Sequence, residues 1–329
     1  MTGERIKKSI ELCAPAGNLP SLREAVDNGA DAVYLGFNND SNLRNFPGLN
    51  FNLEEVRQGI KYARKKRKKI YITVNSYPQH KELKDCYWAI DQAVSLSADA
   101  VIVSDLAVLS YIKKNYPGFR IHLSVQAGAS NHHAIKFYED HFGIKRLVLP
   151  RILTMDEIKD LRGRTDIELE IFVLGLLCIN CEGKCFLSSY ITGESINTYG
   201  ACSSTRFLQF TEGDRMRVSL NKVVLNEYGK SEAMAYPTPC KSRYHNLVTG
   251  QKGYALQDPE SLSILKIFRE LSECGIDAIK IEGRQRSAAY AAKSTAVLRR
   301  ALNGHEDGDD ELRGFFEGME PGYGCYLNK

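Results

Sequence analysis

The sequence of 329 residues has no apolar run that approaches the roughly 18 residues needed to span a membrane. Its opening residues, Met1-Thr2-Gly3-Glu4-Arg5, lack the apolar segment of a secretory signal. Charge of one sign is not in large excess, because the net charge is only +4. These absences predict a cytoplasmic protein with no membrane span.

The densest positive charge lies at residues 64–69, which are all lysine or arginine. This run ends a predicted helix, where cations complement the helix terminus. We therefore interpret it as a solvated helix end and expect no nucleic-acid partner. A patch that binds nucleic acid or another acidic partner is the alternative.

Eight short runs rich in valine, isoleucine and leucine recur along the chain, and most are followed by a helical pattern. They are residues 11–14, 32–37, 70–75, 100–104, 121–125, 146–149, 169–174 and 278–282. Near-continuous apolar strands alternating with helices are typical of a parallel sheet covered on both faces. Eight such units predict a (β/α)8 barrel of the TIM type, an α/β fold. A doubly wound sheet is less favoured, because no GxGxxG motif follows the first run.

The predicted seventh and eighth strands are about a hundred residues apart, which is too long for a loop without structure of its own. We therefore divide the chain into residues 1–175 (seven barrel strands), 176–276 (an insertion) and 277–329 (the last strand and helix with a tail). Within the insertion, Asp258-Pro259-Glu260 predicts the start of a helix that ends near Cys274. The tail from Asn303 predicts a solvated linker and a short terminal element.

Five of the nine cysteines lie between residues 178 and 240, inside the insertion. Cytosolic cysteines are seldom disulfides and more often bind metal or act in catalysis. Only one CxxC motif is present, Cys178–Cys181, and the CxxxCxxC pattern of radical enzymes is absent. Both zinc and an iron–sulfur cluster take four thiolates, and the wide spacing of Cys202 and Cys240 is typical of a cluster held between loops.

A barrel places its active site at the carboxyl ends of its strands, so the insertion lies over that mouth. The polar residues that end the other strands are Asn75, Asp105, Gln126, Arg151, Glu282 and Arg284, and the neighbouring loops add Arg44, Arg206, Arg243 and Arg286. Because guanidinium groups form paired hydrogen bonds with carboxylates, this cationic mouth predicts a small carboxylate ligand.

A cysteine protease is a further possibility, since it needs a thiolate beside a histidine. His122 lies on a predicted strand and His245 follows Cys240 closely. Neither forms a known nucleophile signature, so this interpretation is less favoured.

Several long motifs resemble the collagenase-like U-32 peptidase family. They occupy residues 11–20, 28–34, 44–51, 170–178, 183–195 and 280–287. The resemblance is greatest to the UbiU-type branch, which acts in ubiquinone biosynthesis. It implies an oxygen-independent hydroxylase that carries a 4Fe-4S cluster and takes its oxygen from prephenate. It also implies a heterodimer with a UbiV-like, cluster-bearing homologue.

By motif position the resemblance assigns the cluster to Cys178, Cys185, Cys202 and Cys240, and leaves the role of Cys181 open. Arg151, Arg206, Arg284 and Arg44 are the predicted substrate-binding residues, and Gln126, Asn75 and Glu282 are the catalytic candidates. Relatives that act on RNA are expected to be longer, which favours the ubiquinone hypothesis at this stage. A tRNA or rRNA hydroxylase and a true peptidase are the alternatives.

Overall fold

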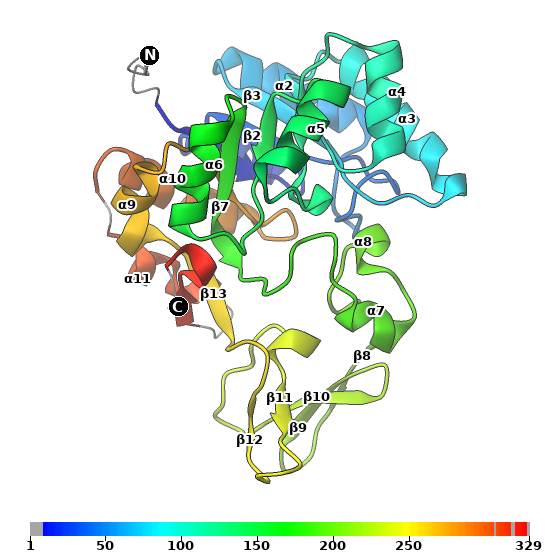
Figure 1. The fold of residues 1–329 in the computed structure, drawn as a ribbon. Coiled ribbons are helices and arrows are strands. Elements are labelled where there is room, and N and C mark those ends of the chain that lie inside the picture. Colours follow the sequence, from blue (N-terminus) through cyan, green and yellow to red (C-terminus); the bar gives the residue numbers. More distant parts are fainter. Residues whose placement is uncertain (1–8, 306, 317–319, 328–329) are drawn as a thin grey trace.

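Eight parallel strands close into a barrel in the computed structural model, which describes residues 9–305, 307–316 and 320–327 (Figure 1). They are β1 (Glu11–Pro15), β2 (Ala32–Leu35), β3 (Lys69–Val74), β4 (Ala100–Val103), β5 (Ile121–Leu123), β6 (Arg146–Val148), β7 (Glu168–Leu176) and β14 (Ala278–Ile281). Strand β14 pairs in parallel with both β1 and β7, which closes the sheet. The predicted (β/α)8 barrel is confirmed.

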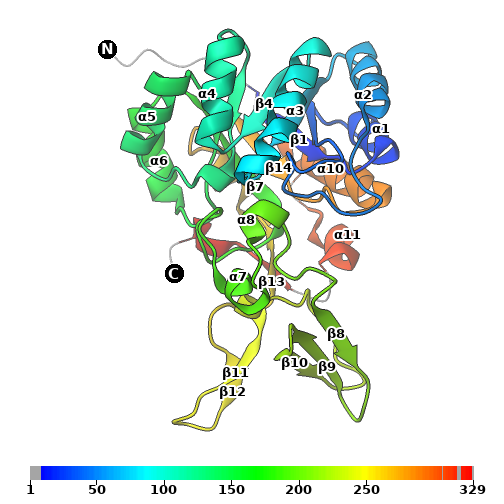
Figure 2. The same cartoon turned by 90° about the vertical axis from the view of Figure 1, so that its right-hand side faces the viewer.

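Helices surround the barrel and cover the outer face of its sheet (Figure 2). They are α1 (Leu19–Asp27), α2 (Leu53–Lys65), α3 (Leu83–Ser95), α4 (Leu106–Asn115), α5 (His132–Phe142), α6 (Met155–Arg164), α9 (Phe268–Ser272) and α10 (Ala288–Leu302). In α2, Asn52 and Glu55 form a reciprocal capping box that satisfies the first free N–H groups. Val56 and Ile60, four residues apart, are both buried against the sheet.

The insertion forms small elements that project from one end of the barrel. Helices α7 (Leu187–Thr192) and α8 (Ile196–Tyr199) lie between the barrel and two small antiparallel sheets (Figures 1 and 2). The sheets are built from β8 (Leu208–Thr211), β9 (Met216–Leu220) and β10 (Val223–Tyr228), and from β11 (Arg243–His245) and β12 (Lys252–Tyr254).

The predicted helix start at Asp258 is wrong, because residues Glu260–Ser263 form strand β13; the helix begins only at Phe268, as α9, and ends near Cys274 as predicted. This strand pairs antiparallel with the extended end of β7, with Leu262 opposite Gly175. On its other side it pairs with β15 (Glu320–Gly322) from the tail. Strand pairing with segments distant in the sequence outweighed the local helix-capping signal of Asp258 and Pro259. The chain therefore rejoins the barrel sheet at Glu260, and the tail contributes a strand as well as α11 (Asp309–Leu312).

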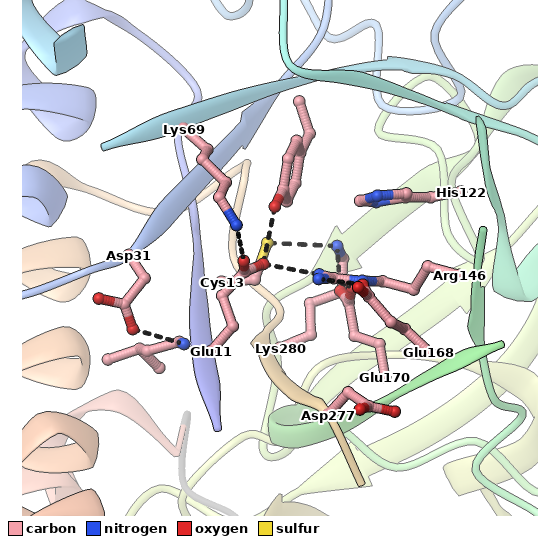
Figure 3. A network of polar contacts seen from close by, with 12 residues as sticks. Glu11, Cys13, Asp31, Lys69, His122, Arg146, Glu168, Glu170, Asp277 and Lys280 are labelled. Carbon is pink, nitrogen blue, oxygen red and sulfur yellow. Dashed lines mark hydrogen bonds and ion pairs between the residues drawn. The ribbon is translucent and has the colours of Figure 1, made fainter. Parts of the chain in front are cut away.

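The barrel interior holds a network of buried charges (Figure 3). The carboxylate of Glu170 is fully buried and lies 2.7 Å from Lys280 Nζ and 3.0 Å from Arg146 Nη1. Arg146 also reaches Glu11 at 2.7 Å, and Glu11 pairs with Lys69 at the barrel rim. Each buried charge has an opposite partner, as a low-dielectric interior requires.

This network predicts acid sensitivity through Glu11. Burial alone would raise the pKa of Glu11, but Arg146 and Lys69 stabilise its charged form and lower the pKa from 4.5 to about 2. The carboxylate therefore stabilises the fold above pH 4.5, and this contribution is lost as the pH falls toward 2. The expected loss is about 3 kcal/mol. Urea unfolding across this range measures it. In the Glu11→Gln variant the free energy of unfolding should depend less on pH in this range. An unchanged pH dependence would contradict the role given to Glu11.

In the part of the chain that the structure describes, no helix combines the length and the apolar character needed to cross a membrane.

Candidate functional site

A cavity of about 150 Å³ lies where the carboxyl ends of the strands meet the insertion. Its lining includes the predicted residues Arg44, Asn75, Gln126, Arg151, Glu282 and Arg284. These side chains follow five different strands, and closure of the barrel brings them to one place.

Four of the ten predicted mouth residues do not line the cavity, namely Asp105, Arg206, Arg243 and Arg286. Arg206 lies outside its lining, is more than half exposed and pairs with Glu194. Asp105 caps α4, where it accepts hydrogen bonds from the N–H groups of Ala107 and Val108.

Four cysteines from separate parts of the insertion line the same cavity, namely Cys178, Cys185, Cys202 and Cys240. The fifth, Cys181, is not part of the lining and lies close to Gly128 in the loop after β5. The structure therefore brings together the four cysteines that the resemblance selected and places Cys181 apart from them.

Two glycines beside these cysteines allow the insertion to sit against the barrel. Gly183 has φ +81° and Gly200 has φ +74°, in the left-handed region that favours glycine. A Cβ atom on Gly183 would collide with the carbonyl oxygen of Gln126, and one on Gly200 with that of Leu43. Close backbone contact at both points sets the position of the cysteine loops.

The thiols lie close enough to influence one another. Burial raises the pKa of Cys202 to about 11, and Cys240 and Cys185 add to the rise. Burial likewise raises the pKa of Cys178 to about 12. Ionised together, these thiols would repel one another unless a cationic group were bound between them.

Buried or half-buried cations lie next to these cysteines. Arg44 lowers the pKa of Cys202 against the effect of burial, and Arg151 does the same for Cys178. Lys241 is buried and interacts electrostatically with Cys240 and Cys178. Four thiolates with neighbouring cations are a donor set that fits a metal cluster of net negative charge.

Arg151 is the centre of a buried ion-pair group. Its guanidinium lies 2.7 Å from Glu282 and 3.1 Å from Glu182, and it stacks on the ring of Phe172 at 3.9 Å. Glu282 also pairs with Arg44 at 3.3 Å. These arginines are held by carboxylates of the protein itself.

The two carboxylates in this group differ in their pKa shifts. Burial raises the pKa of Glu182 despite the nearby Arg151. For Glu282 the effect of burial is outweighed by Arg151 and Arg44, so its pKa is lowered. The two carboxylates that hold Arg151 thus lie in electrostatically different surroundings, with the pKa raised for Glu182 and lowered for Glu282.

Arg284 differs from the other two arginines because, within the described residues, no carboxylate lies within ion-pair distance of it. Its Nη1 donates to Thr73 Oγ1 at 2.8 Å and to Asn42 Oδ1, and it lies over the ring of Tyr34 at 5.8 Å. Burial lowers its pKa to about 10. A buried guanidinium without an anion is suited to bind one from a ligand.

Sequence reasoning missed Glu182, Lys241 and Lys280, which all line the cavity. Lys280 had a usable signal: it lies in β14, two residues before Glu282, and alternation along an extended chain directs both side chains to the same face. Glu182 belongs to a turn and Lys241 to a three-residue 3-10 helix, and both elements are too short for periodicity to indicate the direction of a side chain.

No histidine lines this cavity among the residues described. His122 is buried inside the barrel, where it contacts Tyr71 and accepts a hydrogen bond from Arg120. A cysteine–histidine pair, which a cysteine protease requires, is thus not formed in the described cavity lining.

The fold and this site define a (β/α)8-barrel protein with a cysteine-bearing insertion over the mouth of the barrel. The model of peptidase family U32 matches residues 17–320. The chain belongs to this family.

Curated relatives in the family carry different names. The chain is 35% identical to an uncharacterized protease of Methanocaldococcus jannaschii, over 95% of this chain and 70% of the relative. It is 33% identical to tRNA hydroxylation protein P1 of Bacillus subtilis, over 93% of this chain and 66% of that protein. It is 30% identical to tRNA hydroxylation protein P of Escherichia coli, over 89% of this chain and 68% of that protein. The chain thus spans about two thirds of the length of these relatives.

Proposed function

We propose that this chain is an oxygen-independent hydroxylase that adds a hydroxyl group to a base in RNA, with tRNA as the first candidate. One observation carries the proposal: four cysteines line one cavity at the carboxyl ends of the strands together with a buried arginine that has no anionic partner among the described residues. The names of the relatives reported above supply the substrate class.

In this proposal Cys178, Cys185, Cys202 and Cys240 hold a 4Fe-4S cluster. Among the described residues, no three histidine, cysteine, aspartate or glutamate side chains are placed to share a single metal ion. The choice of a cluster over a single zinc ion, which also takes four thiolates, therefore rests on the resemblance of the sequence motifs. When bound, such a cluster would supply one-electron chemistry next to the substrate.

Arg284 binds a carboxylate of the oxygen donor, for which prephenate is the proposed molecule. Asn75 and Gln126 line the same cavity and would orient the two reactants. The Gln126 side-chain oxygen is buried without a hydrogen-bond partner, so it is available to accept one from a ligand. Glu282 positions Arg151 and Arg44, and Glu182 also positions Arg151.

This proposal replaces the ubiquinone hypothesis with its RNA alternative. The relatives reported above are named for tRNA hydroxylation or as a protease, and not for ubiquinone biosynthesis. The expectation that nucleic acid is not a partner is dropped with it. A heterodimer with a UbiV-like homologue belonged to the ubiquinone hypothesis and is not part of the proposal.

Nucleoside analysis tests the function directly. The chain is expressed without oxygen in bacteria that lack their own tRNA hydroxylation proteins, and tRNA and rRNA are digested and analysed by mass spectrometry. We expect a nucleoside heavier by one oxygen atom, which is missing when Cys202→Ala is expressed instead. If RNA is unchanged while a ubiquinone precursor gains the oxygen, the RNA proposal is wrong.

A further inference from the structure

Three aromatic side chains are exposed on the short segment between Cys185 and Cys202. Phe186 is 71% exposed, Tyr190 93% and Tyr199 43%. Neighbouring residues of the same segment, Leu187, Ser188, Ile196 and Asn197, line the cavity. The segment therefore contributes to the cavity wall while it presents aromatic rings to solvent beside the cavity.

This segment is fixed in place at both of its helices. The carbonyl of Asn197 in α8 accepts a hydrogen bond from Tyr77 N at 3.0 Å, and Thr198 Oγ1 donates to the carbonyl of Tyr77 at 2.9 Å. At α7, Asn221 Nδ2 donates to the carbonyl of Ile191 at 2.6 Å. The rings are thus carried by an anchored backbone, and this reduces the conformational entropy that the protein loses when a ligand binds.

Positive charge flanks α7 on both sides. Lys184 directly precedes Cys185, and Lys222 follows Asn221, the residue bonded to the end of α7. Both lysines are exposed, and within the described part of the chain neither has an ion-pair partner. Exposed rings between free cations are complementary to an anionic polymer that carries flat bases.

The exposed rings have no evident structural use. Within the described residues, neither Tyr190 nor Tyr199 uses its hydroxyl group in a hydrogen bond, and Phe186 and Tyr190 have no aromatic partner. Phe186 and Tyr190 are four residues apart, so their side chains leave the same side of the helical turn.

We propose that Phe186, Tyr190 and Tyr199, with Lys184 and Lys222, form an aromatic patch that binds single-stranded RNA. Bases next to the target nucleotide stack on the rings while the lysines contact phosphates, and this places the target base in the adjacent cavity. The inference rests on the proposed function, because it assumes that the cavity receives a base. A double helix would keep its bases stacked inside and could not use the rings.

Fluorescence anisotropy with the full chain tests the patch. The probe is a labelled single-stranded RNA of mixed sequence, compared with the same strand annealed to its complement. The wild type should prefer the single strand. Loss of a stacking ring weakens binding at least about fivefold, so Phe186→Ala with Tyr190→Ala should weaken it about 25-fold or more. Lys184→Ala with Lys222→Ala should lower the salt slope by about 1.4.

Two controls separate stacking from other effects. Phe137→Ala removes an aromatic ring that is 45% exposed on α5, and it should leave RNA affinity unchanged. Phe186→Leu with Tyr190→Leu keeps apolar surface without flat rings, and it should still bind RNA weakly. Sedimentation detects self-association. If the alanine variant binds RNA like the wild type but loses self-association, the surface contacts protein and the inference is wrong.

The outcomes also distinguish this inference from the proposed function. Hydroxylated RNA in cells together with unchanged RNA binding by the alanine variant would reject the patch and keep the function. Ring-dependent RNA binding without any hydroxylated nucleoside would keep the patch and reject the function. Equal affinity of the wild type for single and double strands would also overturn the patch.

Discussion

Replacing either Cys202 or Cys240 by alanine is expected to remove almost all of the iron and sulfide bound by anaerobically purified protein. Both cysteines line the cavity together with Cys178 and Cys185, and a cluster of this kind requires a thiolate at each corner. Iron and sulfide analysis and the visible absorbance measure the effect. Circular dichroism checks that the barrel remains folded.

Cys181→Ala is the matched control for this experiment, since it removes a neighbouring thiol that lies outside the cavity lining. We expect it to keep its full iron content. A variant without Cys181 that loses iron, together with a Cys185→Ala variant that keeps it, would show that the ligand set is different.

The second large effect is expected at Arg284, where replacement by methionine should weaken prephenate binding about 10- to 100-fold. The arginine is buried, and within the described residues it has no carboxylate within ion-pair distance, so its charge is available to a ligand. Isothermal titration with prephenate measures the change. Arg206→Met is the control, because Arg206 lies outside the cavity and should not affect the affinity.

The replacement of Arg284 by methionine should not lower the free energy of unfolding. Burial lowers the pKa of Arg284 from 12.5 to about 10, which means that the fold disfavours its charged form. This penalty is on the order of 3 kcal/mol and acts at every pH below the folded pKa. Its partners keep other hydrogen bonds, since Thr73 Oγ1 donates to Leu35 and Asn42 Oδ1 accepts from Arg44 N. We expect a thermal midpoint equal to or above that of the wild type. A clearly lower midpoint would make Arg284 a structural residue.

The barrel was predictable because its signals are local. Each strand is a short apolar run, and burial on both faces requires this composition wherever the strand lies. The predicted helix start at Asp258 failed for the opposite reason. Asp258 and Pro259 are residue types that often begin a helix. The residues that follow them nevertheless pair with β7 and β15, which are distant in the sequence.

The candidate site was predictable where residues follow barrel strands. Asn75, Gln126, Arg151 and Glu282 line the cavity as expected, since strand ends of a closed barrel meet at one face. Arg206 lies in the insertion, whose position depends on how its loops dock, and the sequence could not indicate that it lies outside.

The sequence by itself determined the parallel barrel, the long excursion between β7 and β14, and the concentration of cysteine within it. Each follows from residue type and order along the chain. Only the tertiary structure decided which cysteines share a cavity, because Gly183 and Gly200 set the loops against the barrel through contacts with distant carbonyl groups. The tertiary structure also decided which arginines have a carboxylate partner: Arg151 and Arg44 pair with Glu282, and Arg284 does not. Ion pairing depends on distance in space, and the order of residues along the chain does not specify that distance.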